Sequence, residues 1–192
     1  MEAYSPTNEV TEPKSAFEGQ LKELFGRAVY SHKTHEKCAD ILLRRLSCIT
    51  WAQISLSALS AGGYVSTLFG TGVFGSIGGF ILSASLLVLN LYTKDHDLGE
   101  SASKHRRTAT DIWLIREKYL SLIFDLEIGG RPLKDLQKER DELAESLYAV
   151  YKAAPSTNSK AYAMAQKALK YDEEMYFSED ELNEMLPKHL RT

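Results

Sequence analysis

The chain has 192 residues, 26% of them charged, and its 23 basic and 26 acidic side chains give a net charge of −3. This balance provides no basic field for nucleic acid, so direct nucleic-acid binding is not expected. The only two cysteines, Cys38 and Cys48, do not form a CxxC pair, which favours a reduced cytoplasmic context over a disulfide framework.

The N-terminal segment is rich in Pro, Ser, Thr and Glu, and we expect residues 1–15 to form a flexible leader. It is acidic and lacks the apolar region of a signal peptide, so membrane insertion would depend on later segments. A helix is predicted to begin near Ser15, where Glu18 completes a capping box. One arc of this helix carries its apolar side, formed by Phe17, Leu21, Leu24, Phe25, Ala28, His32, His35, Ala39, Leu42, Leu43 and Leu46.

From Leu46 to Thr93 the sequence contains no charged residue. This tract is about twice as long as the ~20 apolar residues that a membrane-spanning helix needs, and glycines cluster at its centre. It predicts two transmembrane helices, about 47–67 and 75–92, joined by a short glycine-rich turn. Basic residues flank both spans and none lies in the turn, so both termini are expected to be cytoplasmic. These basic residues are Lys33, Lys37, Arg44, Arg45, Lys94, Lys104, Arg106 and Arg107.

Each predicted span has one polar side. In the first span this side continues the apolar arc of the preceding helix, which indicates one helix with a single inward face across the membrane boundary. The residues on this side of the two spans are Thr50, Gln53, Ser57, Ser60, Tyr64, Thr67, Ser76, Ser83 and Asn90. Gly72, Gly75 and Gly79 form a small-residue ladder that allows close helix packing. The glycine cluster lacks the GxxxxGK[ST] pattern of a P-loop.

After the hairpin, Lys94–Asp97 marks the return to the cytoplasm, and a long helix follows until Gly129–Pro132 ends it. Its apolar-aromatic face holds His105, Ala109, Ile112, Trp113, Arg116, Tyr119, Leu120 and Ile123. A surface helix over 133–154 and shorter helices from about Lys160 to Tyr171 and from Ser178, which opens a capping box with Glu181, complete the tail. The sequence therefore predicts an all-α membrane protein with a two-helix transmembrane hairpin, long cytoplasmic helical extensions and a short helical C-terminal tail.

The pattern His105-Arg106-x-x-Ala109-x-x-x-Trp113-x-Ile115-Arg116-Glu117-x-Tyr119-x-x-Leu122-x-x-Asp125, directly after a two-span hairpin, resembles the SLATT family. These are SMODS- and SLOG-associating two-transmembrane effector domains of bacterial conflict systems. The segment from Arg27 to Glu36 is similar to the first helix of the family. The resemblance covers residues 16–130 and leaves 131–192 as a separate cytoplasmic tail.

The resemblance implies an effector of the bacterial inner membrane that is encoded beside a nucleotide synthase, a nucleotide sensor or a reverse transcriptase. Such an effector is expected to form homo-oligomers among membrane lipids and to permeabilise the membrane during phage infection, which ends the infected cell in abortive infection. The motif residues His105, Trp113, Arg116, Glu117, Tyr119 and Asp125 are candidates for oligomer contacts or signal transmission. A signal would reorganise the helices 17–46 and 105–123 and turn the polar faces of the spans into an aqueous path.

Several features have two interpretations. The polar side of the spans could line a pore or could join helices by hydrogen bonds in a closed, non-conducting scaffold that anchors a partner enzyme. Arg116 could pair locally or could form a salt bridge to another helix or subunit. His32, His35 and Cys38 could bind a metal, although core or interface histidines are favoured because no fourth ligand is evident.

The remaining functional features are weaker. The acidic run from Asp172 to Glu184 is either solvated surface or a docking site for a basic regulator. A small transporter or an enzyme accessory subunit is a further alternative. No catalytic residue set, cofactor site or metal site is predicted, and we expect no enzymatic activity.

Overall fold

The computed structural model describes the backbone of residues 7–68 and 72–191 and the side chains of residues 13–63 and 77–191. Its elements are α1 (Thr7–Leu68), α2 (Gly72–Asp95), α3 (Leu98–Ile128), α4 (Leu133–Ala153), α5 (Ser159–Lys170), α6 (Glu179–Met185) and the 3-10 helix η1 (Lys188–Leu190). These described ranges contain no strand, and the predicted all-α class is confirmed.

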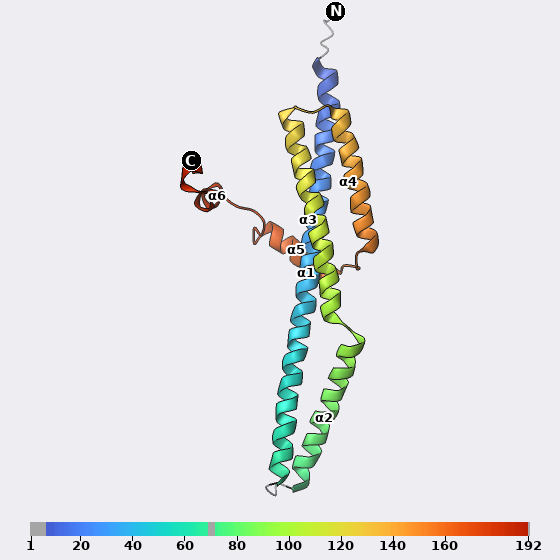
Figure 1. Ribbon diagram of the computed structural model, residues 1–192, viewed down its shortest axis with the longest axis vertical. Coiled ribbons are helices and arrows are strands. Elements are labelled where there is room, and N and C mark those ends of the chain that lie inside the picture. The colour runs from blue at the N-terminus through green and yellow to red at the C-terminus, as the bar shows by residue number, and fades with distance from the viewer. Residues whose placement is uncertain (1–6, 69–71, 192) are drawn as a thin grey trace, which may run out of the picture.

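Helix α1 extends along nearly the whole length of the molecule (Figure 1). Its 62 residues correspond to about 93 Å at 1.5 Å per residue. No break separates the amphipathic N-terminal part from the charge-free part, as the sequence predicts. One rigid element therefore connects the two ends of the protein.

The predicted start of this helix at Ser15 is wrong, because α1 begins at Thr7 and includes Pro13. Residues 7–15 of the expected leader are therefore helical. Pro13 removes one backbone hydrogen bond, to the carbonyl of Glu9, but it lies on an exposed side near the helix start. The helix tolerates the proline there without ending.

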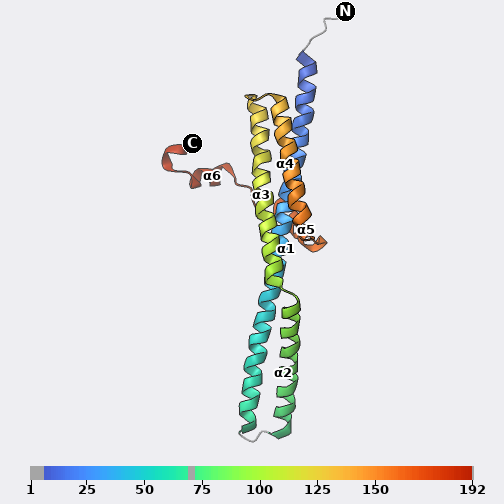
Figure 2. The same ribbon diagram turned by 45° about the vertical axis from the view of Figure 1, so that its right-hand side comes forward.

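The other long helices lie along α1 (Figures 1 and 2). Helix α2 runs antiparallel to the C-terminal part of α1, and α3 continues upward along its N-terminal part. Helix α4 folds back beside α3, so that α1, α3 and α4 form a three-helix bundle above the α1–α2 hairpin. Helix α5 packs across α1 near its middle, while α6 projects away from the bundle.

The apolar core lies in the three-helix bundle, and α1, α3 and α4 all contribute to it. Its buried members are Phe17, Leu21, Ala28, Ile112, Ile115, Tyr119, Leu122, Leu126, Leu136, Leu143 and Leu147. Most of the predicted apolar arc of α1 is buried, but Leu43 is exposed. On α3, Trp113 is also exposed, because the face that packs against α1 is centred on Ile112, Ile115 and Tyr119.

Local sequence signals fix most helix ends. Asp97 caps α3 by accepting a hydrogen bond from the backbone N–H of Glu100 at 2.7 Å. Gly129 ends α3 with φ of 74°, a left-handed conformation that glycine adopts without steric cost. The capping box of Ser178 and Glu181 opens α6. The predicted stop after α3 and the predicted start of α6 are both confirmed.

Candidate functional site

The α1–α2 hairpin carries an apolar surface that the rest of the chain does not cover. Trp51 is 66% exposed, Phe80 72% and Val88 65%, and other large apolar side chains beside them are also exposed. In the described residues, one stretch, beginning at Ile77 in α2, is long and apolar enough to cross a membrane, and 6% of its most apolar window is buried. A core helix of a soluble protein would be mostly buried, so this surface needs lipid or another chain as its cover.

The described part of α1 is less apolar than this stretch and does not reach the hydropathy typical of a membrane span. Its charge-free part carries Thr50, Gln53 and several serines, and these polar side chains lower its hydropathy.

The second span is predicted to begin at Gly75, whereas α2 begins at Gly72. Glycine disfavours a helix by about 1 kcal/mol per residue, which the backbone hydrogen bonds of the apolar helix offset.

Two polar side chains, the half-buried Gln53 and the exposed Asn90, link α1 to α2. The Nε2 atom of Gln53 on α1 donates hydrogen bonds to Oδ1 of Asn90 at 2.9 Å and to Oγ1 of Thr93 at 3.4 Å, both on α2. Sequence reasoning places Gln53 and Asn90 on the inward faces of their helices, and the structure brings them into contact. A hydrogen-bonded amide pair between two apolar helices holds them in one register.

Above the hairpin, a layer of buried histidines joins α1 to α3. The Nδ1 atoms of His35 and His105 lie 2.9 Å apart, so one ring must donate a proton to the other. Nδ1 of His32 donates to the carbonyl oxygen of Ala109 at 2.9 Å. Burial, followed by the nearness of His105 and His32, lowers the pKa of His35 to about 4. Burial also lowers the pKa of His105.

The chain matches the family model described as SMODS and SLOG-associating 2TM effector domain family 4 over residues 17–181. It belongs to this family. The predicted SLATT resemblance is therefore confirmed, and membership implies a membrane effector in a defence system. No curated protein and no solved structure matches the chain.

The SLATT match extends beyond Gly130, where the resemblance was expected to end. It includes α4, α5 and the first residues of α6. This range agrees with the packing, because Leu136, Leu143 and Leu147 of α4 lie in the same core as α1 and α3. The SLATT unit thus contains a third bundle helix in addition to the hairpin and its extensions.

The other predicted polar residues of the SLATT hairpin occupy different positions. Ser60 is buried, and Ser83 is half-buried on α2. Thr50 and Ser57 are exposed, and the hydroxyl of Thr50 donates to the carbonyl of Leu46 at 3.0 Å. The side chains of Tyr64, Thr67 and Ser76 lie outside the described residues.

The glycine ladder lies in the helical part of α2. A Cβ atom at Gly79 would meet no heavy atom within 4 Å, although Gly79 itself is buried. Gly72 and Gly75 lie in the helical backbone of α2, and their surroundings lie outside the described residues. Close helix packing at the glycine ladder stays a prediction.

The SLATT motif residues of α3 separate into buried and exposed groups. Tyr119 is fully buried in the core, and His105 belongs to the histidine layer. Arg116 pairs with the neighbouring Glu117, and its Nη1 lies 3.6 Å from Sδ of Met175. Within one chain Arg116 thus pairs locally, and a salt bridge to another subunit stays a prediction. Asp125 pairs with Arg131 at 2.7 Å, which joins the end of α3 to the turn before α4.

The histidines and the cysteine that could suggest a metal do not converge. Cys38 is buried by α5, where Nδ2 of Asn158 approaches its sulfur at 3.8 Å, while His32 and His35 contact α3. No group of three or more His, Cys, Asp or Glu in the described part of the chain could hold a metal ion. The structure thus places these histidines at a helix interface, where α5 and α3 pack on different sides of α1.

One residue of the acidic run attaches the segment after α5 to α1. Glu174 pairs with Lys33 at 2.6 Å and with Lys37 at 2.9 Å, and these hydrogen bonds lower its pKa. Its neighbours Glu173 and Met175 have positive φ values of 50° and 77°. Left-handed backbone at two non-glycine residues, one on each side of Glu174, is costly, so contacts of this segment must compensate for the strain.

We expect Glu174→Gln to release this segment while the fold persists. The carboxylate is partly exposed, so the loss in global stability should stay below about 1 kcal/mol. Hydrogen exchange of amides 172–177 in the full-length protein should become faster. Glu173→Gln is the matched control, and equal acceleration in both variants would contradict a specific role for the Lys33–Glu174–Lys37 pairs.

Proposed function

We propose that this SLATT protein is an oligomerising effector that permeabilises the bacterial inner membrane when a cytoplasmic signal or partner activates it. The main supporting observation is the exposed apolar surface of the α1–α2 hairpin, together with hydrogen-bonding groups between its two helices. The hairpin crosses the membrane twice, at about 47–67 and 75–92, and both termini are cytoplasmic. The role requires no catalysis.

Oligomerisation is needed because two helices cannot enclose an aqueous path. Each chain has hydroxyl groups in the hairpin that a neighbouring copy or water could hydrogen-bond. The hydroxyl of Ser60 is buried and has no hydrogen-bond partner among the described residues. Thr50 and Ser57 are exposed on the same helix, where polar side chains disfavour contact with hydrocarbon. Thr50 and Ser57 support a polar interface between copies, whereas Ser60 becomes available only when α1 and α2 separate.

Activation can act through α1 because this helix belongs to both parts of the protein. A change at the histidine layer moves α1 against α3, and a continuous helix carries that movement into the hairpin. The outcome is rotation or separation of the faces that contain Gln53, Ser60, Ser83 and Asn90. Pairs in the same layer, such as Arg106 with Asp40 at 2.8 Å, hold the resting arrangement.

The name of the family associates its members with SMODS and SLOG proteins. We therefore propose a co-encoded nucleotide synthase, nucleotide sensor or reverse transcriptase as the activating partner. Additional partners are membrane lipids and further copies of the chain. The balanced charge supports no direct binding of nucleic acid.

A non-conducting scaffold that clusters a partner enzyme is the second candidate. The hydrogen bond from Gln53 to Asn90 favours it, because both amides already have a partner within one chain. Such pairs hold closed bundles together in membranes as readily as they line pores.

The test is release of potassium and dye from liposomes that contain the purified full-length protein and its activator. We expect Gln53→Leu/Asn90→Leu to reduce release to the level of protein-free liposomes, because leucine removes the polar path. Ser85→Leu is the control, since Ser85 is exposed on α2 and its hydroxyl bonds the carbonyl of Ile81.

Oligomeric state is measured in parallel. A double variant that still forms oligomers and has lost release supports the pore. Undiminished release by the double variant would contradict this polar path. A stable oligomer of the wild-type protein that never leaks, even with its activator, would favour the scaffold.

A further inference from the structure

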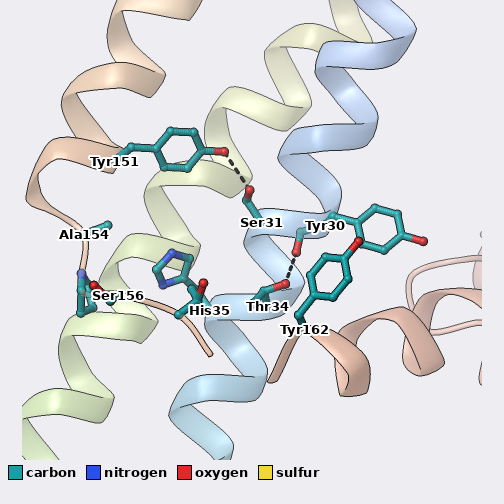
Figure 3. Close-up of a pocket in the computed structure, with 10 residues that line it drawn as sticks. Tyr30, Ser31, Thr34, His35, Tyr151, Ala154, Ser156 and Tyr162 are labelled. Atoms are coloured by element: carbon teal, nitrogen blue, oxygen red, sulfur yellow. Dashed lines mark hydrogen bonds between the residues drawn. The ribbon is translucent and has the colours of Figure 1, made fainter. Parts of the chain in front are cut away.

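A cavity beside the histidine layer has the composition of a binding site for an uncharged aromatic ligand. It has a volume of about 340 Å³ and lies between α1, the end of α4, the α4–α5 loop and the start of α5 (Figure 3). This volume is within the range of small-molecule sites. Its lining residues are Tyr30, Ser31, Thr34, His35, Tyr151, Ala154, Pro155, Ser156, Thr157 and Tyr162.

The lining combines aromatic faces with hydrogen-bonding groups. Tyr30 and Tyr162 lie with their ring centroids 6.0 Å apart, and Tyr162 remains 51% exposed, so part of its surface is open to a ligand. Tyr151 donates a hydrogen bond to Oγ of Ser31 at 2.8 Å, which leaves the proton of Ser31 available to a ligand. Figure 3 shows these side chains around one space.

No Lys, Arg, Asp or Glu lines this cavity. Four further cavities among the described residues differ in this respect, because each includes at least one charged side chain in its wall. A phosphate or carboxylate would therefore find no cation here to neutralise it. The chemistry instead fits a planar, uncharged heterocycle that stacks on tyrosine and exchanges hydrogen bonds with hydroxyls and an imidazole.

His35 connects the cavity to the interface between α1 and α3. Its Nδ1 is bound to His105, so its Nε2 is the ring nitrogen that remains for a ligand. If a ligand donates to Nε2, the neutral ring must carry its proton on Nδ1 and donate to His105. If a ligand accepts from Nε2, the donor and acceptor in the pair exchange. Occupancy therefore sets the direction of the buried hydrogen bond between the two helices.

We propose that this cavity binds a nucleoside through its base, and that binding fixes the tautomer of His35. The base stacks on Tyr162, and its ring nitrogens or exocyclic groups bond Ser31 and His35. The site would supply an input to the effector, but the binding itself does not depend on the proposed pore and is measured without any conductance readout.

Binding of adenosine, guanosine, cytidine and uridine to the full-length protein in nanodiscs is measured by equilibrium dialysis. Their 5′-monophosphates and empty nanodiscs are run in parallel. We expect saturable binding of at least one nucleoside, with no gain from the phosphate. Tyr162→Ala should weaken binding about tenfold because a stacking face is lost. Tyr171→Ala is the control, since Tyr171 is 78% exposed and does not line the cavity.

A second readout follows the ring nitrogens by ¹⁵N NMR of histidine-labelled protein. Signals of His35 should shift on binding, while those of the exposed His96 and His189 should not. Absence of saturable binding by all four nucleosides would overturn the proposal. So would a monophosphate that binds more than tenfold tighter than its nucleoside, or unchanged affinity in Tyr162→Ala.

Discussion

Replacing Leu136 with alanine should lower the free energy of unfolding by about 2–5 kcal/mol, the usual range for a buried leucine. Leu136 lies on α4 with no exposed surface and packs in the core that α1 and α3 share. Its truncation leaves a cavity where three helices meet. Urea unfolding of the full-length protein in detergent measures the loss. It is followed by tryptophan fluorescence in a Trp51→Phe background, where Trp113 is the tryptophan that remains.

The outcome decides whether residues after Gly130 act as a tail or as part of the folded unit. Leu114→Ala is the matched control, because Leu114 is 51% exposed on α3 and its truncation should cost less than about 0.5 kcal/mol. A Leu136→Ala variant as stable as this control would show that α4 adds little to the bundle. The unit would then be held by α1 and α3 alone.

The three-helix bundle should lose stability as the pH falls from 7 to 4, because His35 is buried in its neutral form. The pKa of His35 drops from 6.5 to about 4 on folding, so the unfolded chain binds the proton more readily across this window. The stabilisation is complete above pH 6.5 and declines as the pH falls toward 4. At 1.36 kcal/mol per pKa unit, the loss is about 2 kcal/mol by pH 5 and about 3 kcal/mol by pH 4.

Urea unfolding at several pH values measures this effect. His35→Asn/His105→Asn should remove most of the loss between pH 7 and pH 5, a range above the ordinary pKa values of carboxylates. His96→Asn is the control, because His96 is exposed and stacks on Tyr92 outside the bundle, with ring centroids 4.7 Å apart. If the double variant kept the full pH dependence, the histidine pair would not be its source.

Local patterns in the sequence determine much of the fold. The charge-free tract predicts the α1–α2 hairpin, and the unbroken pattern from Phe17 to Leu46 predicts that α1 continues into it. Gly129, Ser178 and Glu181 mark helix ends, because turn and capping preferences depend on neighbouring residues alone. The inward phase of Gln53 and Asn90 follows from helical periodicity, and their hydrogen bond agrees with it.

Packing between distant segments decides the rest. The sequence alone does not show that α4 completes the core, that α5 buries Cys38, or that His35 meets His105, since each contact joins residues far apart in the chain. Pro13 likewise predicts a later helix start than the structure has, because α1 continues through the proline. Periodicity determines which face of a helix is inward, whereas the partners on that face depend on how the helices assemble.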